Sequence, residues 1–271
     1  YFFDTSSTKI IIFPEGGRRK PSIIILGEDV SKKYHPGIKE RIGVQLQSSA
    51  YYTFLNLHEI LELFASFYNK SVKSRDLLKM VHLEDKSNSL VGNLSGGQKQ
   101  RFSIVASLIN DPEIVFLDEP TTGLDPIARR NLWNLISAIK NQGKTIILTT
   151  HYMEEAEILC DRIAIMERGR ILKMGNTHTL VEHANNPYKI NFYSENVSSL
   201  VQDKLKNFGI FRNLAGKSSH FEMELKTQKN LNSALTIIHK LDPESLTVGK
   251  ATLEDLFIEL TGKQLEEEEN A

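Results

Sequence analysis

The sequence is poor in three features that would place it in a particular class of protein. It contains one cysteine, Cys160, so no disulfide can form within the chain, and a reducing cytosol is the expected compartment. Its formal net charge is −1, which gives no excess of positive charge for binding nucleic acid, so no nucleic-acid partner is expected. No apolar run approaches the roughly 18 residues that a membrane-spanning helix needs. Hydrophobic residues nevertheless make up 40% of the 271 positions, enough for one large globular domain or a large and a small one.

One stretch, residues 94–125, contains most of the residues on which the functional interpretation depends. It opens with Ser95, Gly96 and Gly97, and hydrophobic residues then recur at helical spacing, which predicts a helix from about residue 97 to residue 110. Glycines at the start of a helix leave backbone N–H groups accessible to an anion, which the helix dipole also attracts. This segment is therefore a candidate for contacting an anionic ligand.

A short apolar run in the same stretch ends at two acidic residues. Residues 114–117 are continuously hydrophobic, as in a strand that is buried on both faces of a parallel sheet. Asp118 and Glu119 follow at the carboxyl end of that strand, where open α/β sheets bind their ligands. Two carboxylates at this place can divide the chemistry, because one can hold a metal ion while the other polarises a water molecule.

These motifs, in this order, resemble those of the ATP-binding cassette (ABC) ATPases. Residues 94–98 resemble the signature loop of that family, residues 115–119 its Walker B strand, and residues 122–125 its D-loop. The resemblance runs from about Ser22 to about residue 180. It implies an α/β fold with a P-loop NTPase-like core and a helical subdomain at about residues 48–93.

The resemblance and the residue patterns together divide the chain into segments. We expect an unmatched N-terminal segment at 1–21, an ABC ATPase domain at 22–185, a small α+β C-terminal appendage at 186–263 and an acidic tail at 264–271. In the appendage, alternating and amphipathic segments predict the order strand, helix, strand, strand, helix, strand, with a closing helix. The N-terminal part of the core is expected to be incomplete, since only residues 9–13 could replace its central strand.

The resemblance also implies which residues form a site for ATP and Mg²⁺. Glu119 and His151 are the implied catalytic residues: Glu119 acts on the attacking water, and His151 contacts the γ-phosphate and orients that water. Gln47 is assigned to the Q-loop in preference to Gln45 because it ends its predicted strand. The implied nucleotide-binding residues are Gln47, Ser95, Gly96, Gly97, Gln98, Asp118 and Asp125, and the implied metal ligands are Asp118 and Gln47.

The sequence departs from the family in one motif, the loop that cradles the phosphates. The Walker A pattern Gly-x-x-x-x-Gly-Lys-Ser/Thr does not occur in it. Residues 16–20 have the wrong spacing and precede Pro21, and residues 143–145 precede a strand where the motif needs a helix. We therefore expect weak nucleotide binding in this chain's own half of the site. Residues 95–97 would still face a nucleotide held by a second ABC ATPase subunit, so a dimer with an intact partner could form one site.

The function that the resemblance implies is ATP-driven export through a separate integral membrane permease. The appendage is similar to the tails of exporters of the drug-resistance (ABC-2) type, so the expected cargo is a small drug, antibiotic or lipid-like molecule. In this family the permease inserts a coupling helix beside the Q-loop, and Tyr51, Tyr52 and Phe54 are candidates for that contact. The expected location is cytoplasmic, at the inner face of the cell membrane.

Three interpretations remain open at this point. The first is an exporter subunit whose N-terminal part has been lost or scrambled, which the start at Tyr1 and the onset of resemblance near Ser22 favour. The second is a non-hydrolysing subunit that completes or regulates a partner's site. The third is a non-transport ABC ATPase acting on ribosomes or DNA, which the single cassette and the near-neutral charge disfavour. The family is one of ATP hydrolases, but the missing Walker A lysine leaves hydrolysis by this chain open.

Overall fold

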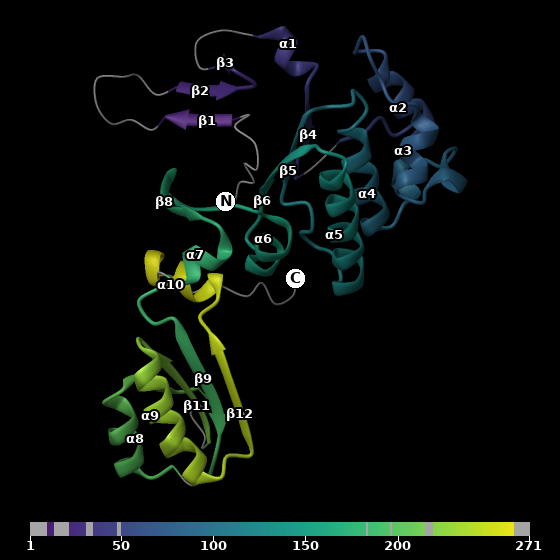
Figure 1. The fold of residues 1–271 in the computed structure, drawn as a ribbon. Coiled ribbons are helices and arrows are strands. Elements are labelled where there is room, and N and C mark those ends of the chain that lie inside the picture. Colours follow the sequence, from purple (N-terminus) through teal and green to yellow (C-terminus); the bar gives the residue numbers. More distant parts are fainter. Residues whose placement is uncertain are drawn as a thin grey trace. The chain divides into compact units, whose positions relative to one another are not determined.

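The computed structural model describes residues 10–13, 22–30, 35–47, 50–182, 184–195, 197–214 and 219–262. The chain divides into two compact units, Tyr1–Met166 and Glu167–Ala271 (Figure 1). The expected loop at residues 14–21 and the expected acidic tail at residues 264–271 lie outside the described residues. The domain boundary expected at residues 185/186 stays a prediction.

A three-stranded parallel sheet forms the centre of the first unit. Its strands lie in the order β4 (Ile42–Gln45), β5 (Ile114–Asp118) and β6 (Thr145–Thr149). The predicted buried strand is confirmed as β5, in which Val115 has no exposed surface. Because the three strands run in the same direction, their carboxyl ends meet at one edge of the sheet.

Helix α4 (Gly96–Ala106) begins at the glycine pair, as predicted. Ser95 is its N-cap, and a capping box with Gln98 satisfies N–H groups of the first turn. The helix ends at Ala106, short of the predicted residue 110. The physical reason is that Ser107 Oγ donates to the carbonyl of Ile104 and the N–H groups that follow bond three residues back, so the chain continues in turns.

The remaining described elements after β5 in this unit are α5 (Pro126–Asn141), α6 (Met153–Leu159) and β7 (Ile163–Glu167). Pro126 occupies the first turn of α5, as expected from its fixed backbone angle. The buried face of this helix includes Leu132, Leu135, Ile136 and Ile139.

The helical region consists of α2 (Leu57–Ala65), α3 (Ser74–Met80) and 3-10 turns at Glu84–Lys86 and Val91–Asn93. Asn56 is the N-cap of α2, and its Oδ1 accepts a hydrogen bond from the backbone N–H of Glu59 at 2.9 Å. In the sequence, Phe67 continues the helical spacing of Leu57, Ile60 and Phe64. Helix α2 ends at Ala65, and the Phe67 side chain beyond it is 68% exposed.

Three short strands near the N-terminus form a separate antiparallel sheet. They are β1 (Ile10–Phe13), β2 (Ser22–Ile25) and β3 (Glu28–Asp29), and a short helix α1 (Pro36–Lys39) precedes β4. Ile10 pairs with Ile25, so β1 hydrogen-bonds to β2 and lies outside the parallel sheet. Among the described residues no strand therefore replaces the central strand that the family resemblance leads one to expect; residue 9 lies outside them.

The second unit begins with β8 (Arg170–Gly175) and α7 (Thr177–Glu182). It continues with β9 (Tyr188–Tyr193), α8 (Ser199–Lys206), β10 (Gly209–Asn213), β11 (His220–Leu225), α9 (Gln228–Ile238), a 3-10 turn (His239–Leu241), β12 (Ser245–Lys250) and α10 (Leu253–Thr261). This confirms the predicted order of strands and helices. The sheet is antiparallel in the order β10-β11-β9-β12, and Phe192 of β9 packs in one core with Leu205 of α8 and Ile238 of α9.

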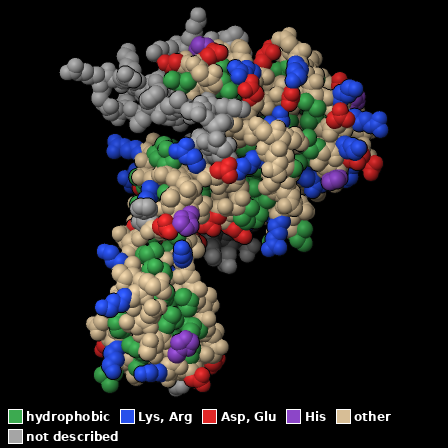
Figure 2. All heavy atoms as spheres, viewed as in Figure 1, with side chains coloured by type: hydrophobic (Ala, Val, Ile, Leu, Met, Phe, Trp, Pro, Cys, Tyr) green, Lys and Arg blue, Asp and Glu red, His purple; other side chains and the backbone are tan. Residues whose placement is uncertain are grey.

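Acidic and basic side chains are interspersed over the described residues on the face shown in Figure 2. Within the described ranges, no helix is both long enough and apolar enough to cross a bilayer.

Candidate functional site

The acidic pair lies at the carboxyl end of β5, where the predicted site was placed. Asp118 is the last residue of the strand, and it pairs with Thr149 at the end of β6. The Thr149 hydroxyl donates to Asp118 Oδ1, and the backbone N–H of Glu119 donates to the Thr149 carbonyl at 3.0 Å. Glu119 has a φ of +46°, in the left-handed region that residues other than glycine rarely occupy. Such backbone outliers concentrate at functional sites.

Three polar side chains from different segments lie around the Glu119 carboxylate. Gln47 Nε2 donates to Glu119 Oε2 at 3.0 Å, and the Thr122 hydroxyl donates to the same oxygen at 3.3 Å. His151 Nδ1 lies 3.4 Å from Oε1. The structure thus brings Gln47, Asp118, Glu119 and His151 to one edge of the sheet, while their roles in catalysis stay predictions.

The two glutamines near the end of β4 have different environments. The expectation that Gln47 ends this strand is wrong, because β4 ends at Gln45, two residues earlier. Gln45 is 1% exposed and donates from Nε2 to the carbonyl of Leu46 at 2.6 Å. Gln47 lies beyond the strand with an exposed side chain that reaches Glu119. The geometry therefore favours Gln47 as the residue that contacts a ligand at this edge.

A cavity of about 380 Å³ lies beside the acidic pair. Its lining residues are Val44, Gln45, Leu46, Phe116, Leu117, Asp118, Ile147 and Thr149. These described residues include a carboxylate but no lysine or arginine, so they supply no cation to neutralise phosphate groups.

The predicted signature residues form the first turn of α4. Gln98 Oε1 accepts from the backbone N–H of Ser95 at 3.0 Å and from Lys86 Nζ at 3.2 Å. A Cβ on Gly96 would meet no atom within 4 Å, whereas one on Gly97 would lie 3.4 Å from the Cβ of Ala128 in α5. Gly96 is thus open on that side, and Gly97 packs close to α5.

Asp125, predicted to contact nucleotide, is the N-cap of α5. Its Oδ1 accepts from the backbone N–H groups of Ile127 and Ala128, both at 2.9 Å. Capping alone accounts for this aspartate, because it satisfies N–H groups that the helix leaves unpaired. A role in nucleotide binding stays a prediction.

Sequence reasoning missed several polar residues behind the site. Arg129 lies over the ring of Tyr152, with Cζ 4.1 Å from the ring centroid, and the rings of Tyr152 and His151 are 4.1 Å apart. Glu155 is fully buried and accepts from Trp133 Nε1 at 3.0 Å. Burial raises the pKa of the Glu155 carboxyl, although hydrogen bonds from neighbouring groups oppose the rise. Neighbours in sequence give no signal for the contacts of Arg129 with Tyr152 and of Trp133 with Glu155, because each contact joins residues that are far apart in the chain.

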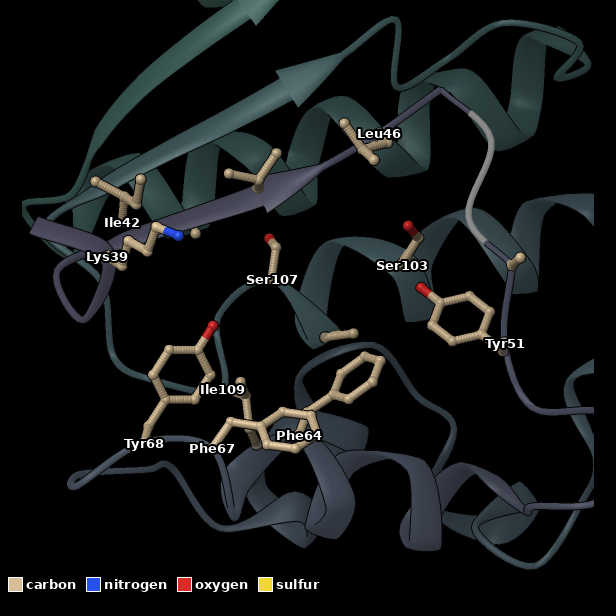
Figure 3. A pocket seen from close by; sticks show the side chains of 14 residues that line it. Lys39, Ile42, Leu46, Tyr51, Phe64, Phe67, Tyr68, Ser103, Ser107 and Ile109 are labelled. Atoms are coloured by element: carbon tan, nitrogen blue, oxygen red, sulfur yellow. The ribbon is translucent and has the colours of Figure 1, made fainter. Parts of the chain in front are cut away.

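A groove of about 540 Å³ separates β4 from the helical region (Figure 3). Its lining includes Ile42 of β4 and Leu46, just after β4, and on the other side Tyr51, Phe64, Phe67 and Tyr68. Of the three aromatic residues predicted for this groove, only Tyr51 lines it. Tyr52 and Phe54 are 55% and 75% exposed and pack against each other, with ring centroids 5.8 Å apart.

Comparison with known proteins relates this geometry to a family. Residues 12–122 match the family described as ABC transporter, so the match extends upstream of Ser22. A Nod factor export ATP-binding protein I of Burkholderia lata is 32% identical over 97% of this chain and 86% of its own length. A protein of the same name from Rhizobium sp. is 34% identical over 93% of this chain and 81% of its own length.

Solved structures show the same fold. One described as the ATP binding subunit of an ABC transporter has a TM-score of 0.51 and 28% identity, over 60% of this chain and 69% of that chain. A dimeric ATP-binding cassette bound to ADP and Pi has a TM-score of 0.51 and 25% identity, over 58% of this chain and 73% of that one. By the similarity to the two export ATP-binding proteins, which covers 97% and 93% of this chain, the chain belongs to the ABC transporter family as one of its ATP-binding proteins.

Proposed function

We propose that this chain is the ATP-binding subunit of an exporter that moves a small molecule through a separate membrane permease. The observation that carries the proposal is the convergence of Gln47 and His151 on Glu119, next to Asp118. Relatives that align with most of the chain are named for export, which supports this direction of transport. A drug, an antibiotic or a lipid-like molecule is the proposed class of cargo.

The oxygen-rich edge of the sheet fits Mg²⁺ together with a nucleotide. Mg²⁺ is commonly held by one or two carboxylates plus substrate phosphates, and Asp118 and Gln47 offer a carboxylate and an amide oxygen here. No cluster of three histidine, cysteine, aspartate or glutamate side chains able to hold a metal exists in the described part of the chain, which agrees with a metal that arrives with its nucleotide. Bound Mg²⁺ neutralises charge on the phosphates.

The protein's own residues have distinct tasks in this proposal. Glu119 accepts a hydrogen bond from the attacking water and orients it, and Gln47 and Thr122 hold the Glu119 carboxylate in place. His151, on the other side of that carboxylate, contacts the γ-phosphate end. Phosphoryl transfer depends mainly on such positioning and on charge stabilisation.

The chain alone is proposed to hold nucleotide only weakly. The sequence has no Walker A loop, and the described cavity beside Asp118 has no cationic lining residue. An oriented cationic or N–H clamp on transferring phosphates typically supplies several kcal/mol of stabilisation. The first turn of α4 is nevertheless fully formed, which favours a second role: Ser95, Gly96, Gly97 and Gln98 would complete the site of a nucleotide-holding partner subunit.

The groove between β4 and the helical region is the proposed contact with the permease. It combines exposed apolar side chains, among them Leu46 at 58% and Phe67 at 68% exposure, with the hydroxyls of Tyr51 and Tyr68 (Figure 3). An amphipathic helix of the permease would bury this apolar surface. Binding there places the chain at the cytoplasmic face of the membrane.

The experiment is purification of the chain from its native membranes, with the substitution Phe67→Glu in the groove. We expect an integral membrane protein to co-purify with the wild-type chain and to be lost with Phe67→Glu. Phe54→Glu is the matched control, because Phe54 is equally aromatic and exposed but does not line the groove. Co-purification with ribosomes, or equal binding by both variants, would contradict the proposal.

A further inference from the structure

Three side chains lie one against the next in the order His151, Tyr152 and Arg129. The imidazole of His151 lies 4.1 Å from the ring of Tyr152, measured between centroids, with the two planes tilted by 42°. The guanidinium of Arg129 lies over the Tyr152 ring, with Cζ 4.1 Å from the centroid. An arginine over an aromatic face at this distance is attracted by the ring's quadrupole.

Arg129 has few other partners to hold it. Its Nε is buried and has no hydrogen-bond partner among the described residues, although the charge of buried Glu155 lies near enough to interact with the guanidinium. The backbone N–H of Arg129 donates to the carbonyl of Asp125 at 2.9 Å, so the residue stands on the first turn of α5. The guanidinium is therefore placed against Tyr152 by a rigid helix.

Tyr152 is also fixed through its backbone. Its N–H donates to the Thr150 hydroxyl at 3.0 Å, and the residue is the N-cap of α6. Thr150 is itself buried, 5% exposed. The Tyr152 ring therefore has a defined place between Arg129 and His151, in a segment that follows β6.

We propose that Arg129 and Tyr152 are positioning residues for His151, and that their stack holds the imidazole with Nδ1 toward Glu119. This inference rests on the proposed function, which gives His151 its role at the γ-phosphate end of the site, but the stack itself needs no nucleotide. Without the stack, the half-exposed imidazole would be free to turn into solvent, since its only other described contact is the 3.4 Å approach to the carboxylate. The imidazole would then be absent from the γ-phosphate end of the site.

The test is the NMR signal of the His151 ring in the full chain without nucleotide, assigned with His151→Gln. A proton stacked on an aromatic ring resonates upfield, so Tyr152→Leu should move the His151 ring signals downfield. Arg129→Ala should move them in the same direction and broaden them. The conservative variants Tyr152→Phe and Arg129→Lys keep the aromatic ring and the positive charge, so the His151 signals should stay at their wild-type positions. If the Tyr152 hydroxyl or general packing positioned His151, these two variants would shift the signals as well.

Arg130→Ala is the matched control, because Arg130 is the adjacent arginine on α5 and is exposed. It should leave the His151 signals unchanged. His58 of α2, whose Nδ1 is 2.8 Å from Ser74 Oγ, reports in every spectrum whether the same unit is folded. The inference is overturned if Arg129→Ala leaves the His151 signals at their wild-type positions in a folded chain, or if Arg130→Ala shifts them equally. Because nucleotide is absent, either result is independent of whether the chain binds ATP.

Discussion

The side-chain amide of Gln47 donates a hydrogen bond to Glu119 Oε2 at 3.0 Å, across 72 positions of sequence. The two residues meet because β4 and β5 are adjacent and parallel, so the residues just past their carboxyl ends lie side by side. His151, which follows β6, approaches the other oxygen of the same carboxylate. Strands β4 and β6 thus bring Gln47 and His151 to the carboxylate of Glu119, which follows β5.

The capping box of α4 makes a measurable contribution to stability. Replacing Gln98 with alanine removes the acceptor for the Ser95 N–H and for Lys86. We expect the free energy of unfolding to fall by about 1 kcal/mol, the usual cost of losing a helix cap. Urea unfolding followed by the fluorescence of Trp133, the single tryptophan, measures this.

The matched control for this change is Gln142→Ala, at the exposed C-cap of α5. Surface substitutions of that kind usually stay within about 0.5 kcal/mol of wild type. Equal unfolding midpoints for the two variants would show that the capping box does not stabilise the folded unit.

Gly43 in β4 leaves no room for a side chain. A Cβ at this position would lie 2.0 Å from the backbone oxygen of Ser107, which cannot move without displacing the end of α4. Gly43→Ala should therefore destabilise the first unit by about 3 kcal/mol, at the upper end for overpacked interiors. At Gly92, where an added Cβ meets nothing within 4 Å, alanine should change stability by less than about 1 kcal/mol. Similar unfolding curves for the two variants would disprove the close approach.

Glu155 should make stability fall as the pH rises. Burial raises the pKa of this carboxyl above its ordinary value of 4.5, so the folded chain keeps a proton that the unfolded chain releases. The stabilisation that protonated Glu155 provides is complete at pH values below its ordinary pKa of 4.5, and it is lost as the pH rises through the raised pKa.

Glu155→Gln removes this titration while keeping an oxygen for the Trp133 N–H. Unfolding free energies from about pH 4 to about pH 8 should show the wild type losing stability relative to the variant. Parallel pH curves, or a wild type that gains stability relative to the variant, would contradict the assignment.

Asp111 has the opposite dependence on pH. Hydrogen bonds from Lys144 and Lys70 lower the pKa of its carboxyl from 3.8 to about 2. The stabilisation that ionised Asp111 provides is present at pH values above its ordinary pKa of 3.8, and it is lost as the pH falls through about 2. Because the side chain is 40% exposed, solvent screening limits the effect to roughly 0.5–1 kcal/mol.

Asp111→Asn tests this pair of contacts, since asparagine tolerates the φ of +50° found at this position. The variant should be less stable than wild type at neutral pH and low salt, and the difference should shrink in high salt. A difference that is insensitive to salt would assign the effect to something other than the two lysines.

Much of the fold could be predicted because local patterns and the tertiary structure agree. The apolar run at residues 114–117 forms β5, the middle strand of the parallel sheet, and the glycine pair at residues 96 and 97 begins α4. These features depend on residues that are neighbours in sequence, so the sequence of one chain is enough to predict them.

Hydrophobic periodicity could not predict the features that depend on distant partners or on where a helix ends. Phe67 continues the helical spacing of α2, yet the helix ends first and leaves the ring in a groove. The left-handed backbone of Glu119 and the stack of Arg129 on Tyr152 arise from contacts between separate elements. Ser107 ends α4 through a hydroxyl contact that the hydrophobic periodicity does not encode.

The central claim is that the hydrolytic end of the site is formed while the chain lacks the loop that would hold the phosphates. The measurement that tests it most directly is equilibrium binding of a fluorescent ATP analogue, with Mg²⁺, to the purified chain alone. The account predicts no saturable binding up to high micromolar nucleotide, and no difference between the wild type and Asp118→Asn. Tight binding that Asp118→Asn abolishes would contradict it, because the chain would then contain a phosphate-binding element other than the Walker A loop.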